Sequence, residues 1–527
     1  MKGSTVRRLS TLLPNLTPKT DRPSFSGNPR KARDPLPIPH RTIPEPKGRD
    51  FDFVSVASSH LIHSDWEKLE RLSSDFTPFR TKHVLLKIQR DYVLSLEFFN
   101  WVKVRIPGCH SRESHSILLH VLTKNGKFKS ADSVMRSLTD SWGANWLNDH
   151  REFLHTILDT YRACDSSPRV LDGIFKSYSH MKKLRCATDA FCLMKEYGML
   201  PKIESCNAFL SASLQMGRSD IMLSFYREMR RCRISPNVYT VNMIMGAYCS
   251  SGNVEKAVEL FEGMEGMGLS QSLVSYNTLI SGYCNKGLTG MAIKLKDRME
   301  KGGIHPNVIT FNTLINGFRK EAKLYEANRI IGEMKSMKVA PNTITYNSLI
   351  YGCSELGNSE LGSRFFEDME KNGVKADILT YNALILGFCK EGKTKKAAYL
   401  VKELDKKNLS PNSSTFSALI LGQCVRNNPD RGFQLYKSMK RTGCQPNNET
   451  LNMLMCSFLK CKDIDGALDV MREMLHLLVI PDANVFLDLC RELCQQGKKK
   501  LVADLCDEME EKDRIPAGFD RDQVLCS

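Results

Sequence analysis

The sequence lacks the features that mark several common classes of protein. It contains no apolar run long enough to span a bilayer, so a membrane protein is not expected. Its eighteen cysteines include no C-x-x-C pair, and a disulfide scaffold is not expected in a chain of 527 residues. We therefore expect most of these thiols to be buried and reduced, which suits a reducing compartment.

Positive charge is concentrated at the N-terminus. Residues 1–50 hold eleven Lys or Arg against four Asp or Glu, which leaves +9 of the total formal charge of +16 to the other residues. A moderately basic body favours a polyanionic partner. The length exceeds what one compact core supports, so the chain contains either several domains or an array of repeats.

The first 50 residues have the composition of a targeting segment and a linker. Residues 1–20 carry Lys2, Arg7, Arg8 and Lys19 without an acidic residue, which is typical of an organellar transit peptide. A merely disordered basic leader is the alternative. Six prolines between residues 28 and 47 indicate a linker, because proline interrupts helices. The ordered chain is expected to begin near Phe76, within a helical region that covers residues 51–167.

An internal repeat determines the predicted fold. The segments SYNTLISGYC, TFNTLINGFR, TYNSLIYGCS and TYNALILGFC begin at residues 275, 310, 345 and 380, at intervals of 35 residues. The same register extends without a gap over residues 168–517, which gives ten repeats, followed by a tail at 518–527. A fixed period of this length indicates stacked supersecondary units.

Recurrent residues divide each repeat into two helices. With positions numbered 1 to 35, position 27 is Met in nine of ten repeats and position 20 is often Ala, as in a packed core. Position 15 is repeatedly Gly, where a turn must separate two helices, and position 34 is usually Pro, which ends the second helix. We therefore predict an all-α fold, an α-solenoid of stacked helix-turn-helix repeats whose hand the sequence does not fix. Residues 112–138 keep the pattern weakly, and residues 139–167 fit no clean repeat.

The units resemble pentatricopeptide repeats, most clearly in VSYNTLISGYCNKGLTGMAIKLKDRMEKGGIHPN at residues 274–307. The related tetratricopeptide repeat has 34 residues and a different aromatic pattern. The resemblance covers residues 168–517 strongly and about 77–138 weakly, and the single repeat length is similar to that of the P-type subclass of plants. It implies an organellar protein that binds single-stranded RNA with one base per repeat.

In that family, positions 5 and 35 supply the side chains that contact the base. Asn at position 5 occurs in seven repeats, which helix propensity does not explain, and a carboxamide offers a donor and an acceptor to a base edge. The alternative is that this Asn only caps or ties the hairpin through backbone hydrogen bonds. The candidate RNA-binding pairs are Asn207 and Asn237, Asn242 and Ser272, Asn277 and Asn307, Asn312 and Asn342, Asn347 and Asp377, Asn382 and Asn412, Ser417 and Asn447, and Asn452 and Asp482.

The family's usual correspondence converts these eight pairs into a target sequence. It implies 5′-C-C-C-C-U-C-A-U-3′ or, with either pyrimidine allowed where Asn pairs with Asn or Ser, Y-Y-Y-Y-U-Y-A-U. The pairs Asp172/Lys202 and Leu487/Ala517 of the outer repeats correspond to no base. Position 2, where the family's apolar side chains flank the bases, is apolar in five repeats, with Tyr239, Val274, Ile309, Ile344 and Leu379.

Two motifs match catalytic patterns but are not expected to be catalytic. GFCKEGKT at residues 387–394 matches a phosphate loop, which must follow a β-strand, whereas Gly387 and Gly392 occupy repeat positions 10 and 15. The H-x-E of His150 and Glu152 resembles that of zinc deaminases, but the C-x-x-C ligands are absent. The sequence therefore predicts no catalytic residue, no metal site and no cofactor.

The predicted function is sequence-specific binding of single-stranded organellar RNA, in mitochondria or alternatively chloroplasts. The protein is expected to be a monomer that acts with other RNA-processing factors and without a membrane. A solenoid of the tetratricopeptide kind that binds proteins is the alternative.

Overall fold

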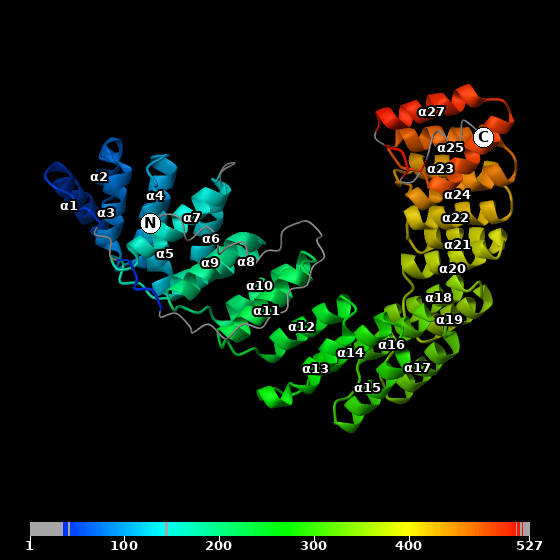
Figure 1. The fold of residues 1–527 in the computed structure, drawn as a ribbon, viewed down its shortest axis with the longest axis horizontal. Coiled ribbons are helices and arrows are strands. Elements are labelled where there is room, and N and C mark those ends of the chain that lie inside the picture. Colours follow the sequence, from blue (N-terminus) through cyan, green and yellow to red (C-terminus); the bar gives the residue numbers. More distant parts are fainter. Residues whose placement is uncertain (1–34, 40–42, 143–145, 513, 517–518, 520–527) are drawn as a thin grey trace, which may run out of the picture. The chain divides into compact units, whose positions relative to one another are not determined.

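A computed structural model describes residues 35–39, 43–142, 146–512, 514–516 and 519 of the chain (Figure 1). Every regular element of these residues is a helix, which confirms the all-α prediction. None of the helices found there is long and apolar enough to cross a membrane. The predicted transit peptide and most of the predicted C-terminal tail lie outside the described residues.

The helices upstream of the ten repeats begin earlier than the sequence suggests. They start at Arg49 and not near Phe76, because α1 buries Ala57 and Leu61 in the core and packs against α3. The segment without a clean repeat contains one regular helix, α7. The helices of this region are α1 (Arg49–Ile62), α2 (Trp66–Arg71), α3 (Pro78–Ile88), α4 (Tyr92–Arg105), α5 (Arg112–Lys124), α6 (Phe128–Asp140) and α7 (Trp146–Thr160).

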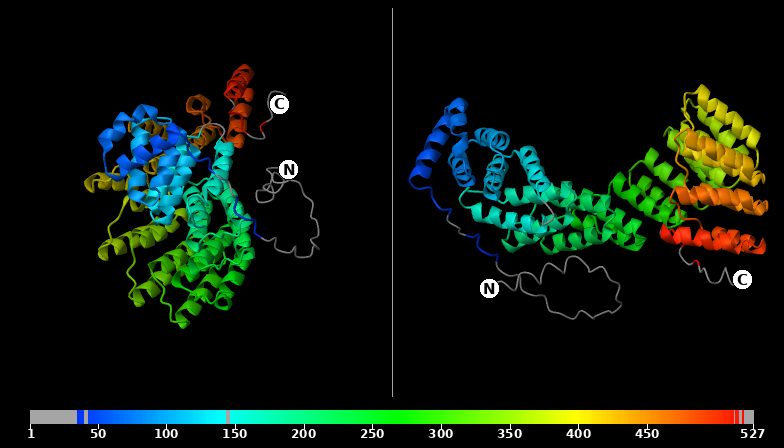
Figure 2. Two further views of the ribbon diagram at one scale, coloured as in Figure 1. Left: turned by 90° about the vertical axis from the view of Figure 1, so that its left-hand side faces the viewer. Right: turned by 90° about the horizontal axis from the view of Figure 1, so that it is seen from above.

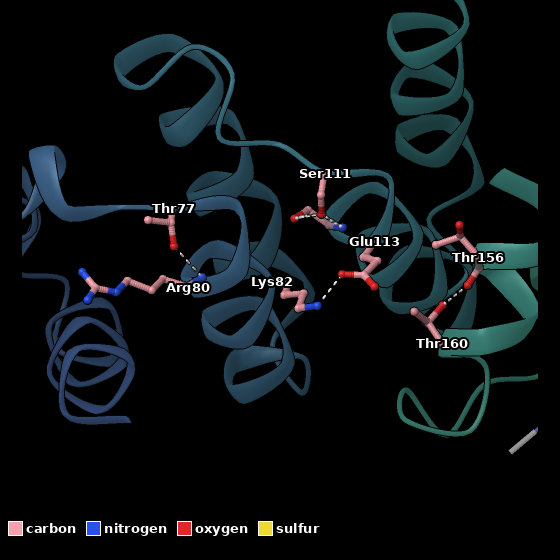
Figure 3. A network of polar contacts seen from close by, with 8 residues as sticks. Thr77, Arg80, Lys82, Ser111, Glu113, Thr156 and Thr160 are labelled. Atoms are coloured by element: carbon pink, nitrogen blue, oxygen red, sulfur yellow. Dashed lines mark hydrogen bonds and ion pairs between the residues drawn. The ribbon is translucent and has the colours of Figure 1, made fainter. Parts of the chain in front are cut away.

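Polar contacts lie within and between these N-terminal helices (Figure 3). Thr77 caps α3 by accepting a hydrogen bond from the backbone N–H of Arg80 at 3.2 Å. Lys82 of α3 reaches Glu113 of α5, with 2.5 Å between Nζ and Oε2. On α7, Thr160 donates to the carbonyl of Thr156 and lies 2.6 Å from the hydroxyl of Ser116, so α5 and α7 share a buried polar contact.

Each of the ten repeats consists of two helices, which occupy positions 1–13 and 17–29 in all but a few repeats. The first helices are α8 (Arg169–His180), α10 (Ile203–Gln215), α12 (Val238–Ser250), α14 (Leu273–Asn285), α16 (Val308–Lys320), α18 (Thr343–Glu355), α20 (Ile378–Lys390), α22 (Ser413–Val425), α24 (Asn448–Lys460) and α26 (Ala483–Gln495). The second helices are α9 (Leu184–Glu196), α11 (Ser219–Arg231), α13 (Val254–Glu262), α15 (Thr289–Lys301), α17 (Leu324–Ser336), α19 (Ser359–Lys371), α21 (Thr394–Lys406), α23 (Pro429–Arg441), α25 (Ile464–His476) and α27 (Lys499–Glu511).

The chain forms two compact units, residues 1–275 and 276–527. In the first unit, α8 packs against α10 and α10 against α12. In the second unit, α16, α18, α20, α22, α24 and α26 pack in succession, and each of the hairpins pairs a first with a second helix (Figure 2). Consecutive first helices therefore form a continuous layer within each unit.

The turn between the two helices explains the glycine at position 15. The backbone there is left-handed in every repeat, with φ of 71° at Gly392 and 59° at Ala322. Glycine adopts this conformation without steric cost, so it is the most frequent residue at this position. Lys182, Asn427 and Lys462 adopt the same conformation with a side chain present.

The core lies between the helices, as the repeat pattern predicts. All ten residues at position 27, including the exception Leu404, have no exposed surface. Glycine at position 10 allows close packing of neighbouring first helices, because a Cβ on Gly422 would lie 2.7 Å from Sγ of Cys389. No disulfide joins the described cysteines, and burial raises the pKa of Cys389 to about 12, so this thiol is protonated.

Candidate nucleic-acid interface

Position 35 is the N-terminal capping residue of the next repeat's first helix. In five repeats its side-chain oxygen accepts a hydrogen bond from the backbone N–H of position 3 of the next repeat, and Oγ1 of the Thr at that position 3 accepts one from the backbone N–H of position 35. For Asn342 and Thr345 these two distances are 3.0 and 3.1 Å. This reciprocal capping box satisfies two backbone donors that a helix otherwise leaves without a partner.

The structure brings positions 5 and 35 of one repeat together in five of the eight candidate pairs. Nδ2 of the Asn at position 5 donates to Oδ1 of position 35. The distances are 3.3 Å for Asn207 and Asn237, 3.4 Å for Asn277 and Asn307, 3.2 Å for Asn312 and Asn342, 3.0 Å for Asn347 and Asp377, and 3.0 Å for Asn382 and Asn412.

The threonine at position 3 of the next repeat completes this network. Its hydroxyl donates to Oδ1 of the Asn at position 5, at 2.6 Å for Thr345 and Asn312 and at 2.6 Å for Thr380 and Asn347. The threonine itself is fully buried. The recurrence of Thr at position 3 is visible in the sequence but does not by itself indicate this role. The residues are Thr240, Thr310, Thr345, Thr380, Thr415 and Thr450.

The network determines which groups remain for a ligand. Because a backbone N–H donates to Oδ1 of Asn342, this oxygen faces the helix and the amide NH2 faces away from it. At Asp377 the hydrogen bonds converge likewise on Oδ1, which leaves Oδ2 to accept from a ligand. An Asn at position 35 therefore offers a donor, and an Asp offers an acceptor.

The carboxylate of Asp377 is ionised at neutral pH. Partial burial alone would raise its pKa, but hydrogen bonds from the Thr380 backbone N–H and the Asn347 amide outweigh burial and hold the pKa below its usual value. Hydrogen bonds to the charged form of an acid stabilise that form.

The other three pairs have different arrangements. Asn242 leaves its Oδ1 buried without a hydrogen-bond partner in the described part of the chain. Ser417 lies 2.7 Å from the hydroxyl of Thr450, which also contacts Asn447, so Thr450 bridges that pair. Asn452 accepts a hydrogen bond at 2.9 Å from the backbone N–H of Asp482.

The apolar residues at position 2 are exposed. Tyr239, Val274, Ile309, Ile344 and Leu379 each leave 57–63% of their surface accessible, which is unusual for large apolar side chains that recur at one position. In the second unit, Ile344 and Leu379 line a groove of about 650 Å³ together with Asn347, Asn382 and Ser417. The groove thus places apolar side chains beside the polar pairs, and flat aromatic bases fit such a surface.

The motifs that resemble catalytic sites have structural roles. Gly387 lies inside helix α20, so no strand precedes the supposed phosphate loop. A Cβ on Gly387 would lie 2.8 Å from Oγ of Ser354, so this glycine allows close packing of neighbouring helices. Lys393 pairs with Glu391, whose carboxylate accepts from the backbone N–H and the hydroxyl of Ser359 at the start of α19. His150 is buried and lies 2.9 Å from the hydroxyl of Tyr178. Among the described residues, no group of His, Cys, Asp and Glu could hold a metal ion.

These observations define a solenoid of helical hairpins that presents paired polar side chains along its first helices. Models of the pentatricopeptide repeat match residues 204–234, 233–265, 271–320, 306–355, 341–389, 376–425, 414–444 and 449–477. The matches cover half of the chain, and the chain belongs to the pentatricopeptide repeat family.

Its relatives include several proteins of Arabidopsis thaliana. Pentatricopeptide repeat-containing protein At4g26680, mitochondrial, is 59% identical over 200 residues, which are 38% of each chain. Pentatricopeptide repeat-containing protein At1g05670, mitochondrial, is 30% identical over 34% of this chain and 24% of its own length. The matches thus span well under half of the length of either relative.

Solved structures of the same family show a distant likeness. The crystal structure of the pentatricopeptide repeat protein PPR10 from maize has a TM-score of 0.40 and 19% identity, over 88% of this chain and 84% of that one. PPR10 in complex with an 18-nt psaJ RNA element has a TM-score of 0.42 and 17% identity, over 90% of this chain and 75% of that one.

Proposed function

We propose that this protein binds single-stranded RNA with one base per repeat and does not catalyse a reaction on it. The proposal rests on one recurrent arrangement: a fixed donor or acceptor at position 35 lies near an exposed apolar side chain at position 2. Stacking of a base on an aromatic side chain contributes about 1–3 kcal/mol in single-strand binding grooves. Tyr239 is the aromatic residue at position 2, and the Val, Ile and Leu residues at this position offer apolar contact to the base faces. Five of the eight repeats carry an apolar residue at position 2, so we expect these five to contribute most of the stacking.

The polar pairs supply the sequence preference in this proposal. Uracil presents N3–H as a donor, so the carboxylate of Asp377 favours uracil, whereas the amide NH2 of Asn342 favours the N3 acceptor of cytosine. From the repeat at 203 to the repeat at 448, the preferred site is Y-Y-Y-Y-U-Y-A-U. We place the chain in the P-type subclass because its ten repeats have one length.

A binding measurement tests the proposal directly. The purified protein should bind the single strand Y-Y-Y-Y-U-Y-A-U more tightly than the same strand annealed to its complement, because a duplex hides the base edges. Both affinities must be measured at one salt concentration, since phosphate contacts depend steeply on salt. Equal affinity for both forms would show recognition of charge alone, and no affinity for either would favour a protein-binding solenoid.

We further propose that the protein acts in mitochondria, with chloroplasts as the alternative. Both relatives named above carry the word mitochondrial in their names, and residues 1–20 combine basic residues with an absence of acid. A fluorescent fusion of residues 1–75 should enter mitochondria, and retention in the cytosol would contradict the proposal. Bound as a monomer, the protein would protect a transcript or recruit other RNA-processing factors by occupying its site.

A further inference from the structure

Two repeats carry the same pair at positions 5 and 35 but differ in geometry. In the repeat at 343–377, Asn347 donates to Asp377 and accepts from Thr380. In the repeat at 448–482, the carboxamide of Asn452 turns elsewhere, because Oδ1 accepts from the backbone N–H of Asp482 and Nδ2 donates to Oδ1 of Asn448 at 2.7 Å. The side chain of Asp482 accepts from the backbone N–H of Asn484 instead.

The residue at position 3 of the following repeat accounts for this difference. After the first pair it is Thr380, whose hydroxyl accepts from the backbone N–H of Asp377 at 3.1 Å and donates to Asn347. After the second pair it is Val485, which can do neither. The N–H of Asp482 still requires an acceptor, and Oδ1 of Asn452 provides it. The carboxamide is thereby drawn to the backbone and away from the carboxylate.

The repeats that follow the first pattern support this account. All five pairs with a direct bond between positions 5 and 35 are followed by a buried Thr at position 3. Where Ser275 takes this place, its hydroxyl lies 3.0 Å from Ser272 and Oδ1 of Asn242 remains without a partner. The bond between the two base-contacting positions thus occurs together with the threonine.

We propose that the residue at position 3 of the following repeat is a positioning residue that decides whether a pair at positions 5 and 35 discriminates between bases. The inference rests on the proposed function and refines it. The repeat at 343–377 then distinguishes uracil from cytosine at the fifth base of the site. The repeat at 448–482 has identical residues at positions 5 and 35 but distinguishes uracil from cytosine only weakly at the eighth base. The reason is that Val485 does not hold the side chains of Asn452 and Asp482 together.

Reciprocal substitutions in the full chain test this proposal. Thr380→Val should reduce the preference for U over C at the fifth base to within about twofold, although positions 5 and 35 are unchanged. Val485→Thr should create a preference of about five- to tenfold at the eighth base, near the low end for a mismatched base. Each ratio comes from competition between two oligonucleotides that differ only at that base, and each variant should leave the other ratio as in wild type.

The controls separate a positioning role from a general loss of stability. Thr442→Val makes the same chemical change at the end of α23 and should alter neither ratio. Among the described residues, the hydroxyl of Thr442 donates to the carbonyl of Met439 and has no other hydrogen bond. If Thr380→Val unfolds the protein, the gain in Val485→Thr decides the question alone. A crystal structure of Val485→Thr should also place Nδ2 of Asn452 within hydrogen-bond distance of Asp482.

The possible outcomes distinguish this inference from the function on which it rests. If wild type prefers U at the fifth base and both ratios are unchanged in the two variants, the proposed role of position 3 is wrong, whereas the proposed RNA binding stands. Wild type without affinity for single-stranded RNA would overturn the proposed function and this inference together.

Discussion

Nδ2 of Asn347 lies 3.0 Å from Oδ1 of Asp377, so the two residues that we expect to contact one base are already joined without RNA. Thr380 holds both of them, through its backbone N–H and its hydroxyl. Side chains fixed in this way lose little conformational freedom on binding, and affinity benefits from such preorganisation. Because the geometry is fixed, repeats differ in whether position 35 offers a donor or an acceptor, and a bound base can distinguish these two cases.

Replacing Asp377 with Asn should shift the preference at the fifth base from U toward C. The new Oδ1 would keep the capping bonds to Thr380, so the amide NH2 would face the base in place of a carboxylate oxygen. We expect a change on the order of 1–2 kcal/mol in the relative affinity for the two bases, with the other seven positions unaffected. Competition between two oligonucleotides that differ at the fifth base measures this change.

The reciprocal variant Asn342→Asp provides the matched control. It converts the pair with Asn312 into the pair found at Asn347, and Thr345 is present to hold it. The fourth base should shift from C toward U by a similar amount. If both variants rank their oligonucleotides as wild type does, position 35 is not a base-contacting position here and the predicted target sequence must be withdrawn.

Replacing Lys393 with Ala should leave RNA binding nearly unchanged. The ammonium group pairs with Glu391 at the surface, and exposed ion pairs contribute little to stability. Wild type should show no ATP hydrolysis above background, because the segment has no phosphate-loop geometry. An ATPase activity in wild type that disappears in this variant would contradict our assignment.

Replacing Gly387 with Ala should destabilise the second unit. A methyl group would lie 2.8 Å from Oγ and 3.2 Å from Cβ of Ser354, and such overpacking typically costs about 1–3 kcal/mol. Gly332→Ala in α17 is the control, because nothing lies within 4 Å of the added methyl. That change should stabilise the helix by up to about 1 kcal/mol in urea denaturation. Equal effects of the two substitutions would mean that close packing at Ser354 is unimportant.

The repeat made most of the fold predictable. Gly, Met and Pro recur at fixed positions, so the boundaries of helices such as α18 and α19 follow from local signals alone. Helices α1 and α2 do not share the period, and the core contacts that order them are not visible in the spacing of residues. For this reason the start of the ordered chain predicted from the sequence, near Phe76, was later than the observed start of α1 at Arg49.

The candidate site was predictable in its residues but not in its geometry. Positions 5 and 35 stand out because they repeat, yet Asn347 and Asn452 look identical in sequence and make different bonds. The difference depends on Thr380 and Val485, each 33 residues further along the chain. A contact between neighbouring repeats of this kind becomes evident only when the stacked helices are seen together.

Acidification should destabilise the N-terminal part of the first unit. Burial lowers the pKa of His110, His120 and His150 to about 4, whereas histidine in an unfolded chain has its ordinary pKa of 6.5. The unfolded state therefore binds more protons between these values. The contribution of each neutral, buried histidine to the free energy of unfolding is complete above pH 6.5. It is lost as the pH falls toward 4, by up to about 3 kcal/mol per histidine.

Tryptophan fluorescence during urea denaturation can measure this effect, because all four tryptophans lie between residues 66 and 146. The urea concentration at the unfolding midpoint should be lower at pH 5 than at pH 7.5. His120→Gln is the informative variant, since the polar contacts of the ring within the described part of the chain are all with uncharged groups, including Ser166 at 2.6 Å and Thr160 at 3.0 Å. Whatever the stability of the variant at pH 7.5, its urea midpoint should change less with pH than that of wild type, because one proton fewer is taken up on unfolding. The same pH dependence in wild type and variant would show that His120 is not held neutral in the folded protein.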